Sequence, residues 1–166
     1  GYGVDSARGV GISFMLIWAP ELWDIVARQW YSNYENYFWK SSQLFSGFRE
    51  FPNNISSKEW MVEVDAGSVI AGYGTAACAF GIGAARANGR FDHAYPLAAE
   101  LIVASIPLID GTLLAPRILS NSTDAPYLGE ASVLFSLTRM PVEGFDIVTD
   151  GYVPIIVYIV ISFLFI

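Results

Sequence analysis

The stretch AGSVIAGYGTAACAFGIGAA, residues 66–85, decides the fold that the sequence predicts. It carries no charged residue and lies between Asp65 and Arg86. At about 1.5 Å per residue, a helix of this length spans about 30 Å, which is the thickness of the hydrocarbon core of a bilayer. We therefore expect a transmembrane helix at about residues 66–86.

The composition of the whole chain favours the same interpretation. Of its 166 residues, 54% are hydrophobic and only 15% are charged, whereas soluble domains average roughly 25% charged residues. The net charge of -7 argues against binding to nucleic acid, which needs clustered Lys and Arg. A single cysteine, Cys78, excludes an intramolecular disulfide and a multi-cysteine metal site.

Two further apolar segments are predicted to span the membrane, at about residues 94–117 and 151–166. The first contains Glu100 and Asp110, and because charges inside a membrane are costly, both should face protein, water or the membrane edge. The second is uncharged but short, about 24 Å as a helix. A shorter apolar run at 10–19 suggests a membrane-surface segment, with a span as the alternative.

Aromatic residues recur at helical spacing in the region that precedes the first predicted span. They fall on one face of a helix, opposite a polar face that includes Glu35. This pattern predicts an amphipathic aromatic helix at about 31–50 that lies on a membrane surface. A helix that faces an ordinary protein core is an equal alternative. The aromatic positions are Tyr31, Tyr34, Phe38, Phe45 and Phe48.

The predicted fold is therefore an all-α integral membrane protein with two to three transmembrane helices. Residues 1–166 are expected to form a single membrane domain. Its parts are a membrane-surface region at 1–60, a transmembrane hairpin at 61–119, an acidic loop region at 120–150 with a short helix around 127–140, and a transmembrane helix at 151–166.

Small residues recur every fourth position along the first predicted span, which is the spacing that lets another helix approach the backbone closely. We expect this face to pack against the second predicted span. The alternatives are docking into another subunit, or contact with a flat pigment or lipid. The residues are Gly67, Ala71, Thr75, Ala79 and Gly83.

His93 and Glu100 are the candidate cofactor ligands. They lie seven positions apart, two helical turns on one face, and either could be the axial ligand of a tetrapyrrole such as chlorophyll or another pigment. Asp92 or Arg90 could then orient the imidazole. The alternatives are an interfacial His93 and a Glu100 that pairs with an arginine. A lone histidine excludes a multi-histidine metal cage.

No catalytic motif is present, since no serine lies in a G-x-S-x-G elbow, and we expect no enzyme. The predicted function is an accessory subunit of an energy-transducing membrane complex, photosynthetic or respiratory, whose partners are other membrane subunits and lipid. Such a subunit would lie in an organelle inner membrane or a thylakoid membrane.

Other membrane functions are alternatives to the accessory subunit. The N-glycosylation patterns at Asn54 and Asn121 would suit a secretory-pathway or plasma-membrane glycoprotein or a channel auxiliary subunit. A proton-coupled transporter would need Glu100 and Asp110 to line a water-filled path.

Overall fold

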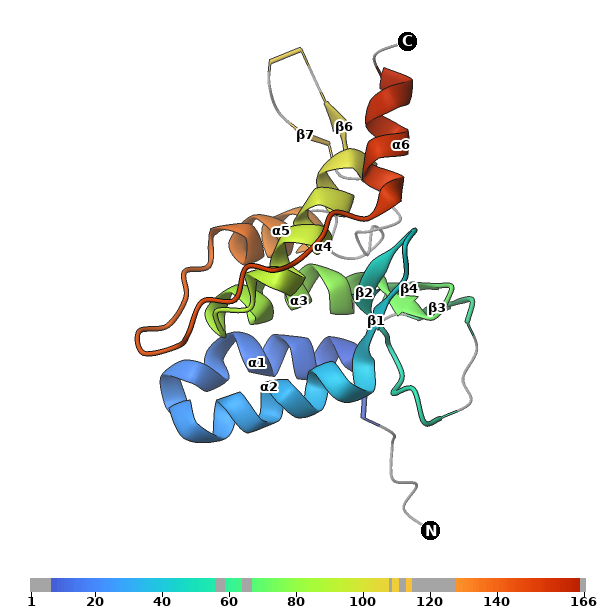
Figure 1. Ribbon diagram of the computed structural model, residues 1–166. Coiled ribbons are helices and arrows are strands. Elements are labelled where there is room, and N and C mark those ends of the chain that lie inside the picture. The colour runs from blue at the N-terminus through green and yellow to red at the C-terminus, as the bar shows by residue number, and fades with distance from the viewer. Residues whose placement is uncertain are drawn as a thin grey trace.

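The computed structural model describes residues 7–55, 59–63, 67–107, 109–110, 113–114 and 128–164, and this part of the chain folds into helices with small antiparallel sheets (Figure 1). The helices are α1 (Gly9–Leu22), α2 (Asp24–Phe38), α3 (Thr75–Ala87), α4 (Phe91–Ala104), α5 (Leu128–Thr138) and α6 (Ile155–Leu164). The strands are β1 (Trp39–Ser41), β2 (Ser46–Phe48), β3 (Met61–Glu63), β4 (Gly67–Ile70), β5 (Tyr73–Gly74), β6 (Ile106–Pro107) and β7 (Leu113–Leu114).

Helix α3 is the centre of the packing, because α1, α4 and α5 all contact it. Figure 1 shows α1 and α2 side by side, with α3 above α1 and α6 beside the end of α4, leading to the C-terminus. The sheets are small: β1 pairs with β2, β3 pairs with β4 and β4 with β5, and β6 pairs with β7, all antiparallel.

The predicted all-α membrane fold is wrong. None of the helices in the described ranges is both long enough and apolar enough to cross a bilayer. The longest apolar helices have 14 residues, as in α1 and α4, which at about 1.5 Å per residue is about 21 Å. The same finding contradicts the localisation predicted from the spans, whether in an organelle inner, thylakoid or plasma membrane.

The stretch at 66–85 is not one helix, because its first half forms a hairpin. Strands β4 and β5 are joined by Ala71 and Gly72, whose φ angles are 51° and 85°. Positive φ at both positions of a two-residue connection is typical of tight hairpin turns and incompatible with a right-handed helix. Only Thr75–Ala87 is helical, and Ala66 lies outside the described residues.

The other two predicted spans also break. Helix α4 begins at Phe91 and ends at Ala104, and Pro107 follows in β6, where a proline ring disfavours helix at the residue before it. Its continuation at 108, 111–112 and 115–117 lies outside the described residues. The third span is reduced to α6, a helix of 10 residues that begins directly after Pro154.

The N-terminal region packs into the core instead of lying on a membrane. In α2, Tyr31, Tyr34 and Phe38 are at most 4% exposed and belong to the main hydrophobic cluster. The core-facing alternative is therefore the correct one for the helix, which ends at Phe38; the rest of 31–50 includes β1 and β2. The run at 10–19 lies in α1 and packs on α3, where the Ser13 hydroxyl donates to the carbonyl of Ala77.

One close approach sets the distance between α3 and the β1–β2 hairpin. A Cβ on Gly81 would lie 2.4 Å from Cδ2 of Phe48, so only glycine allows the ring to reach the helix. Phe48 is fully buried and stacks on Tyr34, with 4.4 Å between the ring centroids. The short helix expected around 127–140 is confirmed as α5, which packs on α3.

Candidate functional site

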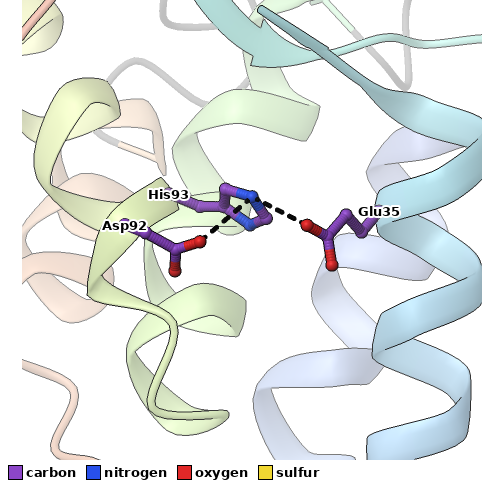
Figure 2. A group of neighbouring side chains, drawn as sticks. All are labelled: Glu35, Asp92 and His93. Carbon is purple, nitrogen blue, oxygen red and sulfur yellow. Dashed lines mark ion pairs between the residues drawn. The ribbon is translucent and has the colours of Figure 1, made fainter. Parts of the chain in front are cut away.

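The lone histidine, His93, lies in the first turns of α4 and is buried against α2 and β1. Its side chain is only 5% exposed, and its ring centroid lies 4.2 Å from that of Trp39. Nδ1 is 3.0 Å from the hydroxyl of Tyr31, and Nε2 is 3.3 Å from Oε1 of Glu35. Figure 2 shows the imidazole between Asp92 of the same helix and Glu35 of α2. Both ring nitrogens therefore have partners within the chain.

Arg90 connects the acidic groups of this cluster. Its guanidinium donates to both oxygens of Glu35, at 2.6 and 2.7 Å, and to both oxygens of Asp92, at 2.9 and 2.7 Å. The hydrogen bonds from Arg90, and after them the contact with His93, lower the pKa of Glu35 from its usual value of 4.5 to about 2. The paired carboxylates raise the pKa of Arg90 further.

The same residues have the chemistry of a metal site but are already neutralised. Glu35, Asp92 and His93 offer ligand atoms that all lie within 4.8 Å of one another. A divalent cation bound there would have to displace the guanidinium of Arg90, which lies 3.3 Å from Nε2 of His93 as well as on both carboxylates. We therefore regard the cluster as an ion-pair network that joins α2 to α4.

A second feature is a pocket of about 280 Å³ that lies beside the hairpins. Helices α3, α4, α5 and α6 and the β1–β2 and β4–β5 hairpins all contribute to its wall. Most of the wall is apolar, and the single ionisable carboxyl in it is Glu100. The lining residues are Phe45, Ser46, Ile70, Ala71, Tyr73, Gly74, Thr75, Cys78, Ala79, Ile82, Leu97, Glu100, Leu101, Val103, Ala104, Val133, Ile156 and Val160.

Glu100 is held at the wall by one hydrogen bond from the backbone. The N–H of Ser46 donates to Oε1 at 2.8 Å, and no Lys, Arg or His of the described residues forms an ion pair with the carboxyl. Burial raises the pKa of Glu100 from 4.5 to about 7, and the hydrogen bond from Ser46 opposes that rise only in part. The carboxyl is therefore poised to change its charge near neutral pH.

Cys78 lies on the same wall but is not an activated nucleophile. Its thiol donates to the carbonyl of Phe48 at 3.5 Å. Burial raises its pKa to about 12, so the thiol stays protonated near neutral pH, and a thiol attacks far more slowly than a thiolate.

The structure brings together part of the predicted site. Ala71, Thr75 and Ala79 of the small-residue face line the pocket with Glu100. Gly83 instead faces α1 and α5, because a Cβ there would lie 3.3 Å from Ile17 and 3.1 Å from Ser136.

The remaining predicted residues lie elsewhere. Gly67 begins β4, and His93 lies in the ion-pair cluster rather than on the pocket wall. The prediction that His93 or Glu100 is an axial pigment ligand stays a prediction. Asn54 is exposed, and Asn121 lies outside the described residues.

Sequence reasoning missed Glu35, which it assigned to the polar face of α2. A signal was present, since Glu35 lies four positions after the buried Tyr31 and therefore on the same side of the helix. Ser46 could not be found in this way, because its contact with Glu100 joins residues 54 positions apart. The suggested pairing of Arg90 and Asp92 with the imidazole corresponds to contacts that the structure contains.

Comparisons with protein-family models, with curated proteins and with solved structures found no match to this chain.

Proposed function

We propose that this chain binds a small, largely apolar molecule in the pocket between α3, α4 and α6. The observation that carries the proposal is the partly buried carboxyl of Glu100 in a wall that is otherwise almost entirely apolar. An apolar pocket with few polar groups is the usual form of a small-molecule site, in which the apolar wall supplies affinity and the polar group fixes orientation.

The size of the pocket limits the ligand. Its volume of about 280 Å³ is close to the lower end of the range of roughly 300–1,000 Å³ that is common for ligand sites. A compact molecule with one or two rings, or a short branched chain, suits this volume better than a tetrapyrrole macrocycle does.

The ion-pair cluster supports a structural role beside this site. Arg90 donates hydrogen bonds to the carboxylates of Glu35 and Asp92, so their charges are neutralised within the cluster. Tyr31 and His93 are at most 4% exposed, so a substrate has no access to these two side chains. The cluster anchors the N-terminal end of α4 to α2, while Glu100 lies nearer the other end of the same helix. Rigid support of this kind keeps the carboxyl at a defined place in the pocket wall.

The first test is binding of the apolar fluorescent dye N-phenylnaphthylamine, which brightens when it leaves water. We expect saturable binding to the wild-type chain. Ala79→Leu, which replaces a methyl group by an isobutyl group on the wall, should weaken binding about tenfold or more, because it fills the space that the dye needs.

The matched control is Ala76→Leu, the same substitution on the same helix at a position that does not line the pocket. It should leave the affinity within about twofold, which corresponds to less than about 0.5 kcal/mol. Thermal unfolding of both variants checks that they are folded. Absence of saturable binding by the wild-type chain, or equal loss in the two variants, would contradict the proposal.

A second candidate function is that of an accessory subunit in a larger protein assembly. It keeps the subunit role expected from the sequence and drops the membrane. Large apolar side chains are exposed on α6, including Phe163 at 76% and Tyr158 at 59%, and on α1 and α2, including Leu22 at 63% and Ile25 at 79%. Exposed apolar side chains that gather on one helix are typical of contact surfaces.

The second candidate is tested by the size of the native particle in an extract of the cells that make the protein. We expect the wild-type chain to migrate above the mass of one copy and Phe163→Ser to migrate at that mass. Ser162→Ala, on the same exposed helix, is the control and should not change the size. Migration of the wild-type chain as a single copy would exclude this candidate.

A further inference from the structure

The proposed pocket has a definite chemical preference, and the following inference rests on the proposed binding function. We propose that the ligand is a protonated amine with an apolar body, whose ammonium group pairs with the carboxylate of Glu100. The apolar body would occupy the space between Ala79 of α3, Leu97 of α4 and Ile156 of α6.

The side-chain donors on the pocket wall, and the backbone N–H nearest Glu100, already have acceptors within the chain. The Ser46 N–H donates to Glu100 at 2.8 Å, and the Thr75 hydroxyl donates to the carbonyl of Ser68 at 2.9 Å. The Cys78 thiol and the Tyr73 hydroxyl each donate to a backbone carbonyl at 3.5 Å.

The acceptors on the same wall keep free lone pairs. Oε2 of Glu100 has no hydrogen-bond donor among the described residues, and a hydroxyl such as that of Thr75 accepts while it donates. A wall whose side-chain donors are occupied, and whose carboxyl and hydroxyl oxygens can still accept, favours a ligand that donates. An ammonium group is the strongest such donor, because it carries up to three N–H groups and a positive charge.

Charge complementarity favours the same ligand. In the described part of the chain, Glu100 has no cationic partner, so a cation from the ligand would neutralise a carboxylate that burial disfavours. The whole chain has 16 acidic and 9 basic residues, a net charge of -7, and this field attracts cations and repels anions. Tyr73 and Phe45 add aromatic surface to the same wall, against which the apolar body of the ligand can pack.

The groups around Glu100 do not titrate in competition with it near neutral pH. Tyr73 of β5 is protonated there, since burial raises its pKa, and burial raises the pKa of Cys78 of α3 to about 12. The α5 and α6 residues on the wall, Val133, Ile156 and Val160, are not ionisable. Lys40 of the adjoining strand β1 lies 5.2 Å from the ring centroid of Tyr73, and no ion pair joins it to Glu100 in the described part of the chain.

The experiment compares three probes that share one apolar body and differ in the head group: phenylpropylamine, phenylpropanol and phenylpropanoic acid. Each competes with N-phenylnaphthylamine for the full chain at about pH 8, above the pKa of about 7 for Glu100. We expect the amine to bind about tenfold or more tightly than the alcohol, and the acid to bind most weakly.

Glu100→Gln is the decisive variant. Its amide oxygen can still accept from Ser46, but it has no charge, so the amine should fall to within about twofold of the alcohol while binding of the alcohol is retained. Glu143→Gln removes the same charge from an exposed loop position and should leave the preference for the amine unchanged.

The pH dependence gives an independent readout. In the wild-type chain, affinity for the amine should rise as the pH increases through about 7, where Glu100 ionises, and affinity for the alcohol should not. In Glu100→Gln the rise should disappear.

The outcomes separate this inference from the proposed function. If dye and alcohol bind and Ala79→Leu weakens both, but the amine has no advantage, the pocket is a binding site and the inference is wrong. An advantage of the amine over the alcohol that survives Glu100→Gln also overturns the inference. Tightest binding of the acid overturns it as well, because the positive end of the α3 dipole would then determine which head group the pocket prefers. If no probe binds, the proposed function itself is wrong.

Discussion

The guanidinium of Arg90 donates two hydrogen bonds to the carboxylate of Glu35, at 2.6 and 2.7 Å, and so joins residues 55 positions apart in the sequence. The pair joins the start of α4 to the middle of α2, and both side chains are partly buried, with 21% and 31% exposed. A planar guanidinium matches the two oxygens of a carboxylate, so the contact fixes the relative orientation of the helices as well as their distance.

The bidentate geometry predicts that another positively charged side chain cannot replace Arg90. Arg90→Lys keeps the positive charge but cannot donate to Glu35 and Asp92 through a planar fork. We expect it to lower the free energy of unfolding by about 1–3 kcal/mol, measured by urea denaturation. Glu143→Gln, at an exposed position, should change it by less than about 0.5 kcal/mol. A stability of Arg90→Lys equal to wild type would contradict this role.

Stability should fall in acid because of Glu35. The pKa of this carboxyl is about 2 in the folded chain and about 4.5 when unfolded, so the folded state favours the ionised form. The resulting stabilisation is complete above about pH 4.5 and is lost as the pH falls toward about 2. Glu35→Gln should reduce this loss by about 1–2 kcal/mol, a value discounted for solvent screening. Equal acid sensitivity of the variant and the wild type would contradict the assignment.

Glu100 should have the opposite effect on stability in the ligand-free chain. Burial raises its pKa from 4.5 to about 7, so the folded chain holds the proton more tightly than the unfolded chain does. The contribution is therefore most favourable below about pH 4.5 and declines as the pH rises through about 7. At about pH 8, Glu100→Gln should be more stable than wild type by about 1–2 kcal/mol, allowing for partial exposure. If the difference in unfolding free energy between Glu100→Gln and wild type were no larger at about pH 8 than at about pH 5, the predicted effect of Glu100 would be refuted.

The contact between Gly81 and Phe48 predicts a steric effect. Gly81→Ala would place a Cβ 2.4 Å from the ring, which must move out of its stack with Tyr34. We expect a loss of about 1–3 kcal/mol in thermal or urea unfolding. Gly11→Ala is the matched control in α1, where no atom lies within 4 Å of the added Cβ, and it should stabilise the helix by up to about 1 kcal/mol. If both substitutions stabilised the chain, the close approach would not be a constraint.

The helical spacing of the aromatic residues predicted part of α2 correctly. Tyr31, Tyr34 and Phe38 do share a buried face, as positions three and four apart on a helix must. The same pattern cannot say what covers that face, because lipid and a protein core both receive apolar side chains. The covering groups, which include Phe48 and His93, come from later segments of the chain.

The site was predictable to a smaller extent. The sequence drew attention to Glu100 and to the small residues Ala71, Thr75 and Ala79, but for packing and pigment binding in a membrane rather than for one pocket. Their meeting depends on the turn at Ala71 and Gly72, which folds β4 back along β5. A window of apolar residues does not reveal such a turn, since Ala and Gly are also common in transmembrane helices.

The sequence by itself therefore determined that 54% of this chain is hydrophobic, that α2 has an apolar face, and that Glu100 stands among apolar neighbours. Tertiary structure alone decided that α1 and α3 bury their apolar residues against each other, that Arg90 neutralises Glu35, and that Ser46 donates to Glu100. The physical reason is that hydropathy measures how strongly a segment avoids water, while the partner that replaces the water comes from residues tens of positions away.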